Sequence, residues 1–116
     1  MVEKKKYTLI HKDIEVARVT ELYQDFPNLS GNYMLSEHLE NENSFLFQYV
    51  EYSIKSDILM EENYGEWEKF SEKEEIKYID LIESKHWFLV DKTGKKHKIV
   101  IPLFYNNNYI GWRWRL

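Results

Sequence analysis

The sequence predicts one α+β domain over residues 1–116, in which an antiparallel sheet of about six strands packs on one main helix. Three features support this prediction. Short segments that alternate apolar and polar residues occupy both ends of the chain, as half-buried strands do. Apolar residues at helical spacing occupy the middle. A chain of 116 residues also suits a single core. The expected order is three strands, a helix, a short ambiguous element and three strands.

Three strands are expected before the helix. Residues 6–11 and 14–20 alternate apolar with polar positions, and Lys12-Asp13 between them predicts the tight turn of a hairpin. A proline, which cannot donate a backbone hydrogen bond, and several turn-forming neighbours predict a loop from Tyr23 to Gly31. The third strand is then expected over residues 31–36.

The main helix is predicted from about Asn43 to Glu62, with Gly65 as its stop signal. Its apolar stripe consists of Phe47, Val50, Ile54 and Ile58, widened by Leu46 and Tyr49. Residues 66–84 leave two interpretations open. Ser71-x-x-Glu74 fits a capping box that would start a short second helix, whereas residues 78–82 also have strand propensity.

Three more strands are expected after residue 84. Residues 87–91 are apolar on both faces, which is typical of a central strand. Residues 92–95 predict a turn and residues 98–103 its return strand. Asn106-Asn107-Asn108 predicts the last turn before the final strand.

The final strand carries an alternating Trp-Arg pattern. In extended backbone, one face collects Ile110, Trp112, Trp114 and Leu116. Arg113 and Arg115 point to the opposite face. We therefore expect the indoles to fill the core and the guanidinium groups to cover the outer surface. If this strand has an exposed edge, it could pair with the same strand of a second copy, so the sequence leaves both a monomer and a homodimer open.

Composition excludes several classes of protein. Without cysteine there is no disulfide, no thiolate metal site and no thiol nucleophile, and we expect a cytoplasmic protein. The basic run Lys4-Lys5-Lys6 is followed by charged residues rather than an apolar segment, so no signal peptide is predicted. No stretch approaches the roughly 18 apolar residues that a membrane span needs.

The net charge of −4 is unevenly distributed. Residues 36–84 carry a net charge of −10, whereas residues 85–116 carry +6. Such segregation steers a charged partner, unless the two segments pack together and cancel locally. The sequence leaves both outcomes open.

No motif in the chain predicts catalysis, a cofactor or a metal site. Thr93-Gly94-Lys95-Lys96 lacks the upstream glycine and the final Ser or Thr of a phosphate-binding loop. The four histidines are not spaced as a helical metal pair, and the serines do not sit in a Gly-x-Ser-x-Gly elbow. We therefore expect a protein that is not an enzyme and binds no metal.

Two segments have the composition of a protein-binding surface. One is the loop that contains Tyr23, Asp25, Phe26 and Asn28, where aromatic groups supply contact area. The other is the acidic group Glu61, Glu62 and Glu66, which would steer a basic partner. The alternative for the loop is that Phe26 and Leu29 fold inward and close the end of the hairpin.

Nucleic-acid binding is the second hypothesis. Its candidate residues are the basic groups near the C-terminus, Lys95, Lys96, Lys98, Arg113 and Arg115. A base-stacking surface would need the tryptophans on the same face as the arginines, and the alternation predicts opposite faces. The acidic middle of the chain also argues against a nucleic-acid partner. A third hypothesis is a small-ligand pocket between sheet and helix that uses His86 and Tyr52.

Residues at the two ends of the chain form a spaced pattern. It consists of Arg18-Val19-Thr20-Glu21, Asp25-Phe26-Pro27, Gly31-x-Tyr33, Leu81-Ile82-Glu83-Ser84, Trp87-Phe88-Leu89-Val90-Asp91, Gly94, Ile101-Pro102-x-Phe104 and Trp112-Arg113-Trp114. This pattern resembles a family of small uncharacterised bacterial proteins, and the resemblance does not extend to the acidic middle. It implies a bacterial, cytosolic setting and no catalytic residue.

The function expected from these observations is a non-enzymatic bacterial module that binds another protein. By analogy of size and charge, a toxin-neutralising immunity protein is an example of this type. The partner is not identified by any motif.

Overall fold

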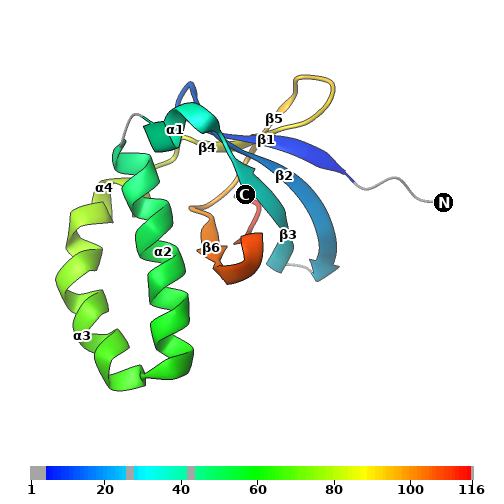
Figure 1. Cartoon of the computed structure of the whole chain (residues 1–116). Helices are drawn as coiled ribbons and strands as arrows, with labels where there is room; N and C mark the ends of the chain where they lie inside the picture. The colour runs from blue at the N-terminus through cyan, green and yellow to red at the C-terminus, as the bar shows by residue number, and fades with distance from the viewer. Residues whose placement is uncertain (1–4, 26–27, 42–43, 116) are drawn as a thin grey trace.

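The structure is a computed structural model that describes residues 5–25, 28–41 and 44–115, with the side chains of residues 23–25 and 40 left out (Figure 1). The elements are β1 (Lys6–His11), β2 (Ile14–Asp25), β3 (Asn28–Leu35), α1 (Glu37–Asn41), α2 (Phe45–Glu62), α3 (Tyr64–Glu74), a 3₁₀ turn η1 (Glu75–Tyr78), α4 (Ile79–Ile82), β4 (Trp87–Val90), β5 (Lys96–Lys98), β6 (Leu103–Tyr105), a 3₁₀ turn η2 (Asn106–Asn108) and β7 (Tyr109–Trp112). The α+β class is confirmed, and the described sheet has seven strands rather than about six.

The sheet closes on itself. Its strands are antiparallel in the order β5-β4-β1-β2-β3-β7-β6. Just beyond β5 and β7, Ile99 pairs with Trp114, and the amide of Arg115 donates to the carbonyl of Lys98 at 2.9 Å. The two distant strands β5 and β7 are thereby joined into one ring. The Trp-Arg segment is consequently paired within the molecule at residues 113–115, and the exposed edge that would allow pairing with a second copy is not present there.

The inward face of the closed sheet forms the core. The fully buried side chains include Leu9, Val19, Trp87, Leu89, Ile99, Phe104 and Ile110. In the tail, Trp112 is buried and Trp114 half-buried, whereas Arg113 is exposed. The predicted alternation of indole and guanidinium groups is confirmed for these residues, and Leu116 lies outside the described residues.

The predicted loop from Tyr23 to Gly31 is wrong. Its residues extend β2 and β3, because Tyr23 pairs with Ser30 and Asp25 pairs with Asn28. Cross-strand pairing has overridden the local turn preference of these residues. Only residues 26 and 27 separate the two strands, and they lie outside the described part of the chain.

The predicted return strand over residues 98–103 is divided in two. β5 ends at Lys98, and β6 begins at Leu103 beside β7. Pro102 interrupts the pairing because it has no amide hydrogen. Its carbonyl accepts a hydrogen bond of 2.8 Å from the Tyr49 hydroxyl of α2.

Helix α2 packs on the sheet through a face that is rotated from the predicted stripe. Ser44 is the N-cap and accepts from the amide of Phe47 at 3.1 Å. The buried residues are Leu46, Tyr49, Val50 and Ser53, whereas Phe47, Ile54 and Ile58 are half-buried. The rotation has a polar cause, because the Ser53 hydroxyl bonds both backbone groups of Phe104 on β6, at 2.8 and 3.0 Å.

A single residue joins α2 to α3. Asn63 has φ −155° and ψ 90°, which is extended rather than helical. Its amide donates to the carbonyl of Leu59 at 2.8 Å, and its side chain accepts from the amide of Glu66 at 3.2 Å. Asn63 therefore ends one helix and caps the next. The predicted stop at Gly65 and the predicted start at Ser71 are both wrong, and residues 71–82 are helical.

Candidate functional site

Helices α2 and α3 form an antiparallel hairpin, which we call the helical arm. Figure 1 shows α3 on the side of α2 away from the sheet, and the lower end of both helices extends past β6. No residue of α3 is buried. The two helices are held by a narrow seam in which Trp67 Nε1 donates to Ser56 Oγ at 2.9 Å and Phe70 lies 5.5 Å from Tyr52, centroid to centroid. The arm is thus a projecting element with most of its surface accessible.

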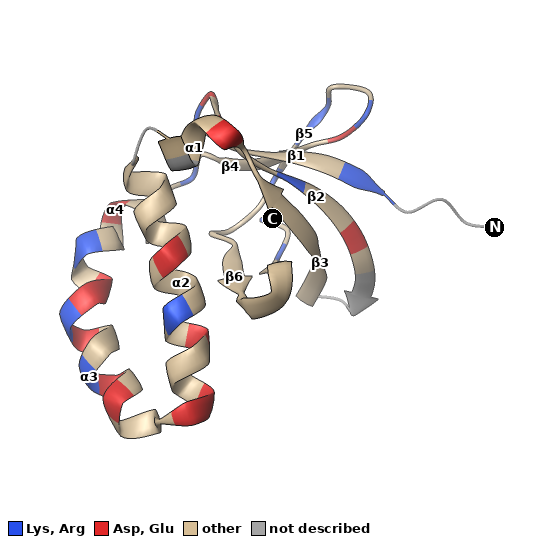
Figure 2. Ribbon diagram, in the orientation of Figure 1, with Lys and Arg blue, Asp and Glu red and all other residues tan. Residues whose placement is uncertain are grey.

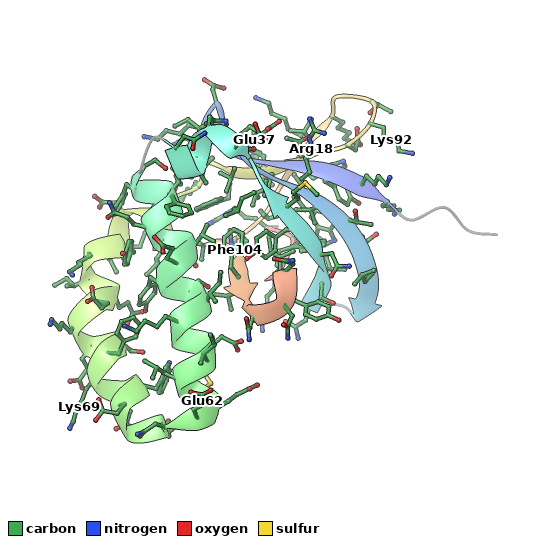
Figure 3. All side chains as sticks on the ribbon, in the orientation of Figure 1. Arg18, Glu37, Glu62, Lys69, Lys92 and Phe104 are labelled. Atoms are coloured by element: carbon green, nitrogen blue, oxygen red, sulfur yellow. The ribbon has the colours of Figure 1, made fainter. Side chains whose placement is uncertain are left out.

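The tip of the arm brings together three of the predicted binding residues. Glu61, Glu62 and Glu66 flank the Asn63 joint and are all exposed. Two large side chains lie among them, Met60 at 47% exposure and Tyr64 at 59%. Figure 3 shows Glu62 at this end of the arm. An acidic surface with exposed apolar groups at its centre has the composition of a protein-binding site.

Acidic residues are concentrated on the arm, and many basic residues lie on the sheet. Residues 45–82 carry ten carboxylates and four lysines. Figure 2 shows many of the red ribbon segments on the arm, interspersed with blue ones, and further blue segments on β1 and on the turn between β4 and β5. The arm's exposed charge is therefore not cancelled by that basic turn.

The predicted loop residues lie elsewhere, on the sheet. Tyr23 and Asp25 end β2, but their side chains are not described, and Phe26 is outside the described residues. Asn28 begins β3, and its Oδ1 accepts from Nε of Arg113 at 2.7 Å. The two segments predicted to bind a partner are therefore on separate elements, the β2–β3 hairpin and the arm (Figure 1).

The basic residues of the second hypothesis lie on β5, on the segment after β7 and on the turn before β5. They are Lys95, Lys96, Lys98, Arg113 and Arg115. Pairing beyond β5 places Arg115 beside Lys98, and the Lys96 Nζ lies 5.7 Å from the ring centroid of Phe88. Arg115 is half-buried and donates to the carbonyl of Ser84 at 3.3 Å.

Asp91 stabilises the turn in this basic region. Its Oδ1 accepts from the Thr93 amide and the Lys95 amide at 2.9 and 3.1 Å, and its Oδ2 lies 2.8 Å from His97 Nε2. Hydrogen bonds from the Thr93 hydroxyl and then from His97 hold the pKa of Asp91 far below its usual range. Both oxygens of the Asp91 carboxylate therefore form hydrogen bonds that stabilise the turn from β4 to β5.

Sequence reasoning missed a partly buried histidine–serine contact. Nε2 of His11 lies 2.7 Å from Oγ of Ser84, beside a hollow of about 660 Å³ between β1, the start of α2 and the segment before β4. Burial, followed by the charge of Lys12, lowers the pKa of the His11 imidazole. The amide of His86 also donates to Ser84 Oγ, at 3.1 Å. This is the bonding of a turn-forming serine, which holds the chain before β4.

The third hypothesis, a small-ligand pocket that uses both His86 and Tyr52, does not agree with the positions of these two residues. His86 lies at the edge of that hollow, whereas Tyr52 stacks on Tyr78 at 4.9 Å between centroids. The structure does not bring His86 and Tyr52 to one pocket.

Over the described residues, no group of three or more histidine and carboxylate side chains is arranged to hold a metal ion. No helix in the same part of the chain is long and apolar enough to cross a membrane. Comparison with family models, with curated proteins and with solved structures finds no match to this chain.

Proposed function

We propose that this protein is a non-enzymatic protein-binding module whose helical arm docks on a basic surface of a partner protein. The observation that carries the proposal is the arm tip, where the exposed carboxylates of Glu61, Glu62 and Glu66 lie on the same two helix ends as the exposed Met60 and Tyr64.

The two kinds of residue at the tip have different roles in this proposal. The carboxylates steer a basic partner and raise its rate of association, an effect that acts over about 10 Å at 0.1 M salt. Met60 and Tyr64 become buried on docking, and large side chains at the centre of an interface supply most of its affinity. A projecting helical hairpin presents both to a concave or flat partner surface without moving the sheet.

The proposed setting is the bacterial cytoplasm, and the proposed type is an immunity protein that blocks a toxin. The support for the type is an analogy, since a small acidic chain without cysteine suits a protein that covers the basic active surface of another protein.

The test is affinity capture from a lysate of the producing organism, with the purified protein immobilised at about 150 mM salt. We expect one stoichiometric protein partner that elutes as salt is raised. The variant E61K/E62K/E66K is expected to lose this partner. Failure to capture a stoichiometric protein under several growth conditions would count against the proposal.

The matched control keeps the same change in net charge. Glu72, Glu75 and Asp80 are exposed on α3, η1 and α4, at least two helical turns from Tyr64. The variant E72K/E75K/D80K is expected to retain the partner, because the tip is intact. Equal loss in both triple variants would show that net charge, rather than the tip, governs binding.

Nucleic-acid binding remains a second candidate because Lys96, Lys98 and Arg115 share one outer surface with the half-buried ring of Phe88. This arrangement provides phosphate contacts beside one aromatic group. It predicts retardation of single-stranded DNA or RNA in a gel at low salt, and loss of retardation in K96E/K98E. Absence of any retardation at low salt rejects this candidate.

A further inference from the structure

The outer face of the sheet has a groove at the crossing of β3, β7 and β6. Ser30, Gly111 and Leu103 lie side by side in the pairing register of these three strands. Side chains at these positions point outward, because the neighbouring Leu29, Trp112 and Phe104 point into the core. Gly111 at the centre of this row contributes no side chain of its own, and a hollow of about 710 Å³ lies beside it.

Tyr105 forms part of the groove because Gly111 gives it room. A Cβ atom on Gly111 would lie 3.1 Å from Cε2 and 3.4 Å from the hydroxyl oxygen of Tyr105. The ring thus lies close over the strand, with its hydroxyl near the floor. Leu103, exposed at 48%, and Val100 and Ile101 add apolar surface on the same side of the groove.

Arg113 supplies the groove with its charge. Among the described residues that line the hollow, no other is charged. Its Nε is bonded to the neutral Oδ1 of Asn28, at 2.7 Å, which fixes the direction of the side chain without neutralising it. Among the carboxylates whose side chains the structure describes, which leaves out Asp25, none forms an ion pair with this guanidinium. Its two terminal nitrogens keep the donors that match a carboxylate.

We infer that this groove is a binding site for a small apolar molecule that carries one carboxylate. The volume is in the range of small-ligand sites, which combine apolar walls with few polar groups. In this arrangement the carboxylate accepts from Arg113, and the apolar body lies against Ile101, Leu103 and the ring of Tyr105. The site is separate from the helical arm, so the inference does not depend on the proposed protein partner.

The test is a titration of the ¹⁵N-labelled protein with 4-phenylbutyrate, followed by two-dimensional NMR, in parallel with 4-phenylbutan-1-ol. The acid is expected to shift the amides of Ser30, Leu103 and Gly111 with a Kd on the order of 1 mM, as a ligand of about 12 heavy atoms allows. The alcohol has the same apolar body without the charge, and we expect it to bind about tenfold more weakly.

Three variants locate the site. R113Q removes the charge at an exposed position and is expected to weaken the acid about tenfold. L103E places a carboxylate on the exposed wall and is expected to repel the ligand. G111V fills the floor and displaces Tyr105, so it is expected to abolish the shifts. The control is R18Q, which removes an exposed arginine of β2 outside the groove and is expected to leave the Kd within about twofold.

Several results overturn the inference. Absence of amide shifts at 5–10 mM acid, on the order of five to ten times the expected Kd, rejects the site. Equal affinity for acid and alcohol, or unchanged affinity in R113Q, rejects the carboxylate anchor. Shifts confined to residues far from β3, β6 and β7 place the ligand elsewhere. Because R113Q and L103E change exposed side chains, the conclusion does not depend on whether G111V folds.

Discussion

The hydroxyl of Ser53 makes the two hydrogen bonds to β6 that a neighbouring strand would otherwise make, so its removal should lower the free energy of unfolding. Its oxygen accepts from the amide of Phe104 at 2.8 Å and donates to the carbonyl of the same residue at 3.0 Å. Both residues are buried, with Ser53 at 7% and Phe104 at 0% exposure. β6 pairs only with β7 in the described sheet, so this hydroxyl satisfies the other side of the strand. Water cannot readily replace it there.

The expected loss of stability in S53A follows from this geometry. Each buried backbone group left without a partner costs about 1–3 kcal/mol, so two groups cost about 2–6 kcal/mol. Alanine is the better helix former, which offsets about 0.5 kcal/mol. Partial relaxation lowers the upper bound, which leaves a net loss of about 1.5–4 kcal/mol and a Tm lower by roughly 6–16 °C at about 4 °C per kcal/mol for a chain of this size.

The assay is urea unfolding followed by circular dichroism and by tryptophan fluorescence. The matched control is S56A, on the same helix, which removes one half-buried hydrogen bond from Trp67 and should cost about 1 kcal/mol or less. A free energy of unfolding for S53A within about 0.5 kcal/mol of the unchanged protein would refute the reasoning. A similar loss in both serine variants would also contradict it, since only Ser53 bonds two buried backbone groups.

Three other predictions concern single residues. G31A should lose more than about 3 kcal/mol or fail to fold, because its Cβ would overlap the backbone carbonyl oxygen of Thr20 on β2. Native-like circular dichroism and an unchanged Tm would contradict this. N63A should lose about 1 kcal/mol and some helicity at 222 nm, because α3 loses the side-chain cap that accepts from the amide of Glu66; unchanged helicity and stability would show that this cap is not needed. The pKa of Asp91 is depressed by Thr93 and then His97, so its contribution to stability is present above the ordinary aspartate pKa of about 3.9 and is lost as pH falls below it. D91N should therefore show a flatter fall of Tm between about pH 6 and 2.5, and equal slopes in the two proteins would exclude this role.

Local patterns in the sequence predicted those elements whose conformation depends on near neighbours. The alternation through Trp112, Arg113 and Trp114 predicted inward indoles and an outward guanidinium, because period-two alternation is a property of extended backbone itself. The main helix and the turn at residues 92–95 were also predicted from neighbouring residues, the helix from its apolar spacing and the turn from its turn-forming residues. In contrast, Ser71 fits a capping box but lies inside α3, because Asn63, eight residues before Ser71, caps that helix at its start.

The two sites differ in how far apart their residues lie in the chain. Glu61, Glu62 and Glu66 were predicted together because they are close in sequence and one hairpin keeps them close in space. Asn28 and Arg113 were assigned to two different hypotheses, yet they are bonded across 85 positions. No local signal placed Gly111 between Ser30 and Leu103, since that row exists only once β3, β7 and β6 are in register.

The sequence by itself determined the α+β class, the inward indoles, the acidic middle and the absence of thiol chemistry, because composition and short-range periodicity are written in neighbouring residues. Tertiary structure alone decided that the sheet closes through Ile99 and Trp114, that the helical arm projects, and that a groove opens beside Gly111. Closure, projection and register arise from contacts between distant segments, whose free energy depends on the whole fold rather than on any local pattern.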